Sequence, residues 1–261
     1  MIWNITTVER TGSTNADLAA RAHGGALEPG DVLIAGEQMA GRGRLERVWS
    51  SPAGSSLALS AALALPAEPT RWPILPLAVG LATATAVTTW GIDARLKWPN
   101  DVLVEEKKLA GILVETRAVP SSTPNSQVKY LAIAGIGLNL SQTVADLPIP
   151  RATSLALAGA TGITPREAAD AVLGALGETM ERWRAEGDAA VLEPYRRLCS
   201  TLGRVVDVTV PSAGGVETIT GRAVAIGDDG RLGLDIAATN VPGDAVRWFG
   251  SGEIEHVRAA R

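Results

Sequence analysis

The chain has 261 residues, 46% of them hydrophobic and 20% charged, and its 24 Lys and Arg against 28 Asp and Glu leave a formal net charge of −4 at pH 7. This length and composition predict a globular protein with one large and one small domain, and the acidic balance argues against general nucleic-acid binding, which needs a basic face. One cysteine, Cys199, excludes an internal disulfide and a multi-thiolate metal site, and two histidines argue against a His-based metal site or a Ser-His-Asp relay.

The start of the chain shows no signal-peptide pattern, and the apolar run over 74–87 is shorter than the ~20 residues that span a membrane. We therefore expect a soluble, cytoplasmic protein with no membrane partner. A first strand is predicted over 3–9, followed by Thr11-Gly12-Ser13-Thr14-Asn15 and a short helix over 16–22. The turn brings hydroxyls and free backbone N–H groups together, although a helix cap alone would explain it.

A second strand over 31–38 leads into a stretch rich in glycine and arginine, Gly41-Arg42-Gly43-Arg44-Leu45-Glu46-Arg47-Val48-Trp49. Its glycines allow the backbone to approach a ligand closely, and its three arginines concentrate positive charge. The stretch lacks the Gly-Lys-Ser/Thr of a Walker loop and the third glycine of a dinucleotide fingerprint. Because it lies between two strands and does not repeat, we interpret it as an ordered anion-binding loop.

A strand over 57–65 and a helix over 70–89 precede a β-meander. In the meander, a strand carrying Lys97 is broken by Trp98-Pro99-Asn100-Asp101 and resumes over 102–104; a second turn over 105–108 leads to a strand over 109–114. Three of the four lysines lie here, in a chain whose other 20 basic residues are arginines. A compact ammonium suits phosphate or carboxylate oxygens. We interpret Lys97 in this way and Lys107 as a solvated turn residue.

After an exposed loop over 120–127, a strand over 129–140 ends in Gly135-Ile136-Gly137-Leu138-Asn139. Its glycines indicate a place where something lies against the strand. Asn139 is either an amide that faces a phosphate-bearing or metal-bound ligand or an ordinary turn residue. A capping box at Thr164 opens a helix to about 186, and a second helix follows over 189–199. From 203 onward, short strands and glycine turns predict a small all-β barrel, with a boundary near Leu202.

Taken together, five motifs resemble the biotin protein ligases (biotin–[acetyl-CoA-carboxylase] ligases). They are Thr-Gly-Ser-Thr-Asn, Gln38 with Ala-Gly-Arg-Gly-Arg, Lys-Trp-Pro-Asn-Asp, Lys-Leu-Ala-Gly-Ile-Leu-Val-Glu and Gly-Ile-Gly-Leu-Asn, in the order and approximate spacing of the family. The resemblance covers nearly the whole chain. It implies an α/β (α+β) fold with a mixed-sheet catalytic domain shared with lipoate ligases, over 1–202, and an SH3-like C-terminal barrel over 203–261.

The resemblance implies a two-step reaction with ATP and Mg²⁺. Biotin is adenylated to biotinyl-5′-AMP, and a lysine of a biotin carboxyl carrier protein then takes the biotin. The catalytic residues implied are Arg42, Arg44, Lys97 and Lys108. The biotin-binding residues implied are Ser13, Thr14, Asn15, Gln38, Gly41, Arg42, Lys108 and Gly111. The nucleotide-binding residues implied are Arg44, Trp49, Lys97, Asn100 and Asn139, with Asp101 as a metal ligand.

Two departures from the family pattern stand out. Glu46 replaces a usual glycine in the arginine loop, which puts the closure of that loop in doubt. No room precedes the first strand for the winged-helix domain of many members, so we expect a ligase without repressor function and without a nucleic-acid partner; a homodimer is left open. Two alternatives remain: a lipoate–protein ligase, and a non-enzymatic module whose Gly/Arg loop contacts nucleic acid.

Overall fold

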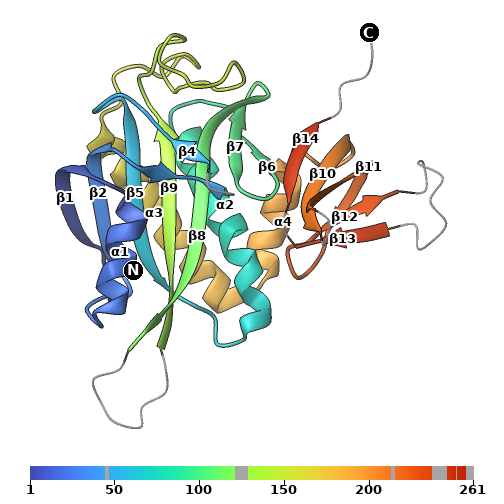
Figure 1. Cartoon of the computed structure of the whole chain (residues 1–261), viewed down its shortest axis with the longest axis horizontal. Helices are drawn as coiled ribbons and strands as arrows, with labels where there is room; N and C mark the ends of the chain where they lie inside the picture. The colour runs from blue at the N-terminus through green and yellow to red at the C-terminus, as the bar shows by residue number, and fades with distance from the viewer. Residues whose placement is uncertain (45–46, 121–128, 213–214, 237–245, 251, 257–261) are drawn as a thin grey trace.

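The computed structural model describes residues 1–44, 47–120, 129–212, 215–236, 246–250 and 252–256. Its centre is a seven-stranded sheet (Figure 1). In spatial order the strands are β1 (Asn4–Thr11), β2 (Asp31–Gln38), β5 (Ser56–Ala64), β9 (Lys129–Asn139), β8 (Lys107–Val119), β7 (Asp101–Val104) and β6 (Arg95–Lys97). β1 and β2 run parallel, and every other neighbouring pair is antiparallel. The meander that carries Lys97 and Lys108 therefore forms one edge of this sheet, and the predicted 120–127 loop lies largely outside the described residues.

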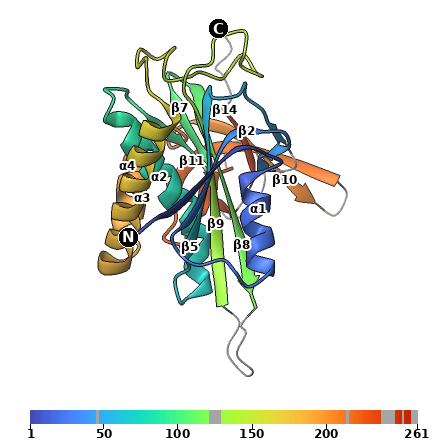
Figure 2. The same ribbon diagram turned by 90° about the vertical axis from the view of Figure 1, so that its left-hand side faces the viewer.

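Helices cover both faces of the sheet. α1 (Thr14–His23) lies on one face, and α2 (Leu75–Thr88), α3 (Pro165–Glu186) and α4 (Ala189–Leu198) lie on the other (Figure 2). Because both faces are covered, every residue of β5 except the last is buried, which explains its unbroken run of apolar and small side chains. Under α1 lies a small core that contains Leu18, Leu33 and Ile133.

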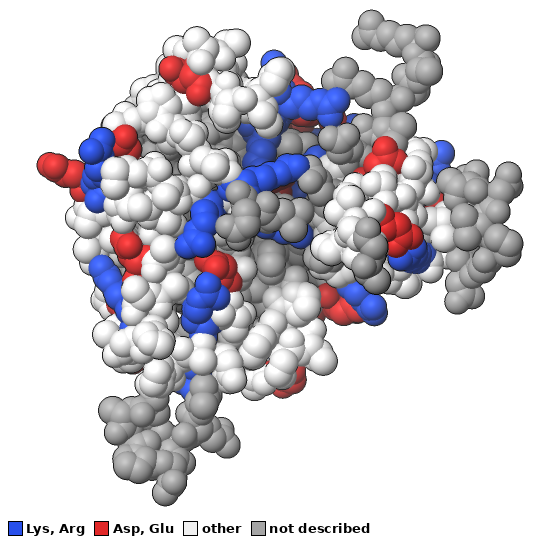
Figure 3. All heavy atoms as spheres, in the orientation of Figure 1, with Lys and Arg blue, Asp and Glu red and all other residues white. Residues whose placement is uncertain are grey.

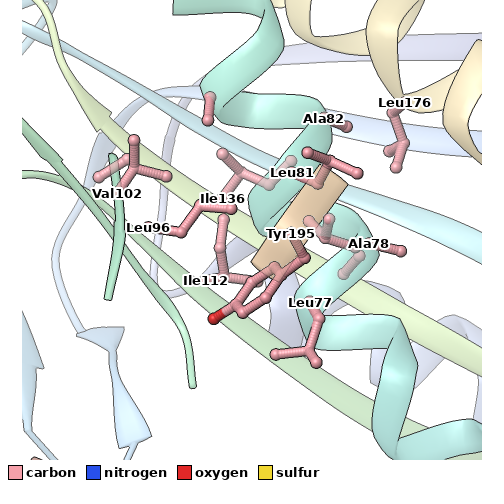
Figure 4. Close-up of a cluster of buried hydrophobic side chains, with 14 of the residues drawn as sticks. Leu77, Ala78, Leu81, Ala82, Leu96, Val102, Ile112, Ile136, Leu176 and Tyr195 are labelled. Carbon is pink, nitrogen blue, oxygen red and sulfur yellow. The ribbon is translucent and has the colours of Figure 1, made fainter. Parts of the chain in front are cut away.

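The larger core lies beneath α2–α4 (Figure 4). Leu77 and Leu81 of α2 meet Leu96 and Ile112 of the sheet, and Tyr195 of α4 lies among them with 1% of its surface exposed. Full burial of a large apolar side chain contributes about 1.5–3 kcal/mol to stability. Cys199 closes α4 and is buried as well, and this burial raises the pKa of its thiol. A buried thiol with a raised pKa is an unreactive core residue.

The helix predicted over 70–89 is wrong in its first part. The chain instead forms a 3-10 helix, η2 (Pro69–Ile74), and α2 begins at Leu75. Pro73 and Pro76 have no N–H to donate, so an α-helical ladder cannot run through this segment. The helix predicted after Thr164 is confirmed: the Thr164 hydroxyl accepts from Glu167 N at 3.2 Å, and Glu167 Oε2 accepts from Thr164 N at 2.9 Å.

The C-terminal part is a five-stranded antiparallel sheet, in agreement with the predicted small β domain. Its spatial order is β13 (Val246–Phe249), β12 (Leu232–Asp235), β11 (Gly215–Ile226), β10 (Val205–Ser212) and β14 (Glu253–His256). Its inward side chains, among them Val206, Leu232 and Ile254, belong to the same hydrophobic cluster as α2–α4. Trp98 Nε1 also donates to Gly230 O at 3.0 Å. The apolar core is continuous across residue 202. The domain boundary near this residue therefore stays a prediction.

Candidate functional site

A cavity of about 1320 Å³ opens between the large sheet and the C-terminal sheet. Lys and Arg side chains gather at the centre of the face shown in Figure 3, around this region. The cavity brings together nearly all the site residues predicted from sequence: Ser13, Thr14, Asn15, Gln38, Arg42, Arg44, Trp49, Lys97, Asn100, Asp101, Lys108, Gly111 and Asn139. Segments separated by more than a hundred residues in the chain therefore share one site.

One end of the cavity is a neutral, buried hydrogen-bond network. Ser13 is the N-cap of α1, and its side chain accepts from Ala16 N. Gln38 Oε1 at the end of β2 accepts from Thr14 N at 2.9 Å and lies 3.1 Å from the Thr14 hydroxyl. Ser60 on β5 lies below, with Oγ 2.7 Å from Thr14 Oγ1 and 2.6 Å from Asn15 Oδ1. Ser13, Thr14, Asn15 and Ser60 are buried, and Gln38 is half-buried.

The network fixes which groups remain for a ligand. Because a backbone N–H needs an acceptor, the Gln38 carbonyl oxygen points to Thr14 and its amide nitrogen remains a donor. Asn15 is bound on both sides: its Nδ2 donates to Glu115 Oε2 at 2.9 Å and to Leu113 O at 3.3 Å. Asn15 therefore supports the site from below, while Thr14 and Gln38 present polar groups to it.

Glycines form a flat floor beside this network. Gly111 on β8 and Gly137 on β9 are paired across the two strands. A Cβ on Gly137 would overlap the Trp49 ring, and a Cβ on Gly135 would overlap the Asn15 amide. The predicted close approach to this strand is thus made by Trp49 and Asn15. Trp49 Nε1 is buried and has no hydrogen-bond partner among the described residues.

The Gly/Arg stretch forms a short antiparallel ribbon of β3 (Gly41–Arg42) and β4 (Val48–Trp49). Gly41 does not line the cavity itself: a Cβ there would lie 2.5 Å from Trp49 O, so glycine allows the two strands of the ribbon to approach. Arg42 and Arg44 both line the cavity. Glu46 lies outside the described residues, so its effect on the loop stays a prediction.

The other end of the cavity is charged. Lys108 Nζ lies 2.6 Å from Asp101 Oδ1 and 5.9 Å from the centroid of the Trp49 ring. Arg44 Nη1 donates to Asn100 Oδ1 at 3.3 Å, and Asn100 Nδ2 donates to Ile112 O at 2.9 Å. Burial lowers the pKa of Arg44 and the nearby Asp101 carboxylate opposes that shift; the guanidinium still keeps its charge at neutral pH. Lys108 and Arg44 are therefore held in fixed positions at this end of the cavity.

Asn139 lines the cavity, but its side chain already has structural partners. Its Nδ2 donates to Thr153 O at 2.8 Å, and its Oδ1 accepts from Gln142 Nε2 at 3.0 Å. It therefore ties the 141–154 segment to the end of β9. Its predicted nucleotide contact stays a prediction.

Several residues that line the cavity or support its hydrogen-bond network were not among the predicted site residues. Arg47 stood in a visible motif, whereas Ser60 sits in an apolar strand without any sequence signal. Arg204 and Arg222 come from the C-terminal sheet, and Arg151 from the segment after β9. Only the tertiary fold brings these three arginines to the cavity.

The predicted metal site depends on the carboxylates that line the cavity. The cavity-lining carboxylates among the described residues are Asp101 and Glu106, and both are ion-paired. No group of three or more metal-ligating side chains occurs in the described part of the chain. A Mg²⁺ ion held by one carboxylate and by substrate phosphates remains compatible with this arrangement. No helix among the described residues is long and apolar enough to cross a membrane.

The fold and the site define a class of protein: a mixed α/β fold with a cavity that has a neutral hydrogen-bonding end beside a cationic end. Residues 7–134 match the Biotin/lipoate A/B protein ligase family. The chain is 36% identical over 256 residues to a biotin–[acetyl-CoA-carboxylase] ligase of Mycobacterium tuberculosis (strain ATCC 25618 / H37Rv), covering 96% of this chain and 88% of that protein. An enzyme of the same name from Paracoccus denitrificans is 36% identical over 202 residues, covering 72% of this chain and 75% of that protein.

Among solved structures, the biotin protein ligase from Aquifex aeolicus in complex with biotin and ATP has a TM-score of 0.76 and 27% identity, covering 98% of this chain and 99% of that one. The chain therefore belongs to the biotin protein ligase family. The predicted family, fold class and ligase activity are confirmed.

Proposed function

We propose that the cavity activates biotin with ATP and then transfers it to a lysine of a biotin carboxyl carrier protein. In the first step a biotin carboxylate oxygen bonds to the α-phosphorus of ATP, and the bond to pyrophosphate breaks. In the second step a lysine amine attacks the acyl carbon, AMP leaves, and the amine loses a proton. The observation that carries this proposal is the neutral hydrogen-bond network joined to a cationic region in one cavity.

The neutral end suits the ureido ring of biotin. Its carbonyl needs a donor, which Gln38 Nε2 supplies because Gln38 Oε1 is committed to Thr14. Its N–H groups need acceptors, and the hydroxyls of Ser13 and Thr14 are the nearby candidates. A site built from neutral partners recognises such a group strongly, because an analogue that lacks it leaves buried polar atoms without partners.

The charged end suits the reaction centre. Adenylation brings a carboxylate and a triphosphate together, so cations that are already in place stabilise the transition state without reorganising. Lys108 and Lys97 are proposed to contact the carboxylate and the α-phosphate, with Arg42 and Arg44 closing over the adenylate. The unpartnered N–H of Trp49 supports a ligand oxygen or a water nearby.

We place the nucleotide near Arg44, Asn100 and Asn139. Mg²⁺ bound there, with Asp101 as its protein ligand, would supply neutralising charge to the phosphates. Biotin is favoured over lipoate, since the relatives described above are named for biotin although the family model spans both acids. We propose a cytoplasmic location, where ATP and a carboxylase carrier are available.

Pyrophosphate release from ATP and Mg²⁺ tests the proposal. We expect release with biotin, little with lipoate, and at least a hundredfold loss in Lys97→Ala. Lys107→Ala is the matched control, because Lys107 is exposed and lies outside the cavity lining. Pyrophosphate release with lipoate alone would contradict biotin as the substrate. Release with neither acid would contradict the proposed adenylation.

A further inference from the structure

The tip of the β7–β8 hairpin has an unfavourable backbone. Val104 pairs with Lys107, so Glu105 and Glu106 form a two-residue hairpin loop. Their φ angles are 48° and 64°, values that this kind of loop requires and that Asn and Gly adopt more readily. A glutamate at such a position is strained relative to glycine, which has no Cβ to clash with the backbone. The backbone alone therefore does not account for glutamate at these two positions.

The Glu106 side chain crosses to the C-terminal sheet. Its two carboxylate oxygens accept from Arg204 Nη1 and Nη2, each at 2.6 Å, in a bidentate geometry. Arg204 immediately precedes β10, and its carbonyl accepts from Ala223 N of β11 at 2.8 Å. The pair therefore joins the hairpin to the backbone of the second sheet. The neighbouring Glu105 side chain is exposed.

The hairpin is the element that carries the charged end of the cavity. Asp101 opens β7, and Lys108 follows Glu106 by two residues on β8. Both Glu106 and Arg204 also line the cavity. A shift of the hairpin tip would move Lys108 relative to the neutral end, and a displacement of about 1 Å can cost a hundredfold in rate.

We propose that Glu106 and Arg204 are positioning residues: their ion pair clamps the hairpin to the C-terminal sheet and holds Lys108 in register with the bound acid. The clamp acts on rate and not on recognition of the ureido group, since Thr14 and Gln38, which present polar groups to the ligand, lie on α1 and β2 and not on the hairpin. It contributes little to global stability, because the side chains of Arg204 and Glu106 are 42% and 53% exposed, respectively.

Four variants of the full chain test the clamp. We expect Arg204→Ala and Glu106→Gly each to lower the rate of biotinyl-AMP formation about tenfold, with KM for biotin within twofold of wild type. Glu106→Gly also relieves the backbone, so its melting temperature should stay level or rise while its rate falls. The double variant should be no slower than the slower single variant. Glu105→Gln, the matched control, should retain the wild-type rate.

The inference rests on the proposed function, so a second readout is independent of any substrate. Amide hydrogen exchange over 101–111 should accelerate about tenfold in Arg204→Ala, with α1 and β2 unchanged. If the wild-type protein forms no biotinyl-AMP, the proposed function fails while exchange still decides on the clamp. Unchanged exchange, additive losses in the double variant, or a rate that falls only together with melting temperature would overturn the clamp.

Discussion

The two ends of the cavity are built in different ways. At the neutral end, Thr14, Asn15 and Ser60 are at most 5% exposed and bind one another through atoms 2.6–2.7 Å apart on adjoining elements. At the charged end, Lys108 and Asp101 are 28% and 18% exposed and belong to an edge hairpin held by more distant parts of the chain. In the proposed function, recognition therefore rests on a buried hydrogen-bond network, and the reaction rests on cations that are partly exposed to solvent.

This difference follows from the cost of burial. Neutral hydroxyls and amides tolerate full burial once they are hydrogen-bonded, whereas a buried charge needs a partner and still loses hydration. Asp101 is the partner that keeps the Lys108 ammonium in place. Four substitutions test the roles of the two ends and of the residues that support them. Each is paired with a control variant.

The largest effect is expected at the charged end. Lys108→Ala should lower biotinyl-AMP formation a hundredfold or more, because it removes the cation that we propose to lie at the developing charge. Binding of biotin, measured by calorimetry without ATP, should weaken much less. Lys107→Ala should behave as wild type; a comparable loss there would mean that general positive charge, not position, matters.

The glycine floor between the ends comes next. Gly137→Ala should raise the KM for ATP about tenfold and destabilise the fold by about 1–3 kcal/mol, because the new Cβ forces the Trp49 ring away. Steady-state kinetics and chemical denaturation measure the two effects. Gly174→Ala on α3 meets nothing within 4 Å and should be neutral or slightly stabilising. Equal behaviour of the two variants would contradict close packing against Trp49.

At the neutral end, Ser60→Ala should raise the KM for biotin several-fold while kcat changes less than twofold. It also costs about 1–3 kcal/mol of stability, since Asn15 Oδ1 loses a buried donor. Ser55→Ala, whose hydroxyl donates to Pro52 O in an exposed turn, is the control. A fall in kcat with unchanged KM would place Ser60 in the reaction instead of in recognition.

The smallest effect concerns the core behind the charged end. Burial raises the pKa of Tyr195 well above its ordinary value of 10.0, and its hydroxyl has no hydrogen-bond partner among the described residues. A raised folded-state pKa means that stability is lost as pH rises above about 10, where the unfolded chain ionises first. Tyr195→Phe should flatten this alkaline loss and change stability at pH 7 by less than about 1 kcal/mol. Tyr130→Phe, exposed at 47%, should leave the pH profile unchanged.

Sequence reasoning found the strands and helices well where local patterns were strong, as in β2 and α3, whose bounds agree with the structure. It failed over 70–74, where Pro73 and the following Pro76 outweighed an apolar pattern. The motif residues converge on one cavity, as the family resemblance implied. Ser60 and Arg204 escaped detection because their roles depend on partners 45 and 98 residues away, which no local pattern records.

The continuous apolar core determines how the protein unfolds. Val206, Leu232 and Ile254 are buried in the same hydrophobic cluster as residues of α2 and α4. Separating the C-terminal sheet from the large sheet would therefore expose apolar surface on both parts. The two architectural parts should then melt in a single cooperative transition, with one calorimetric peak. A fragment ending near residue 202 would aggregate instead of surviving as an autonomous enzyme.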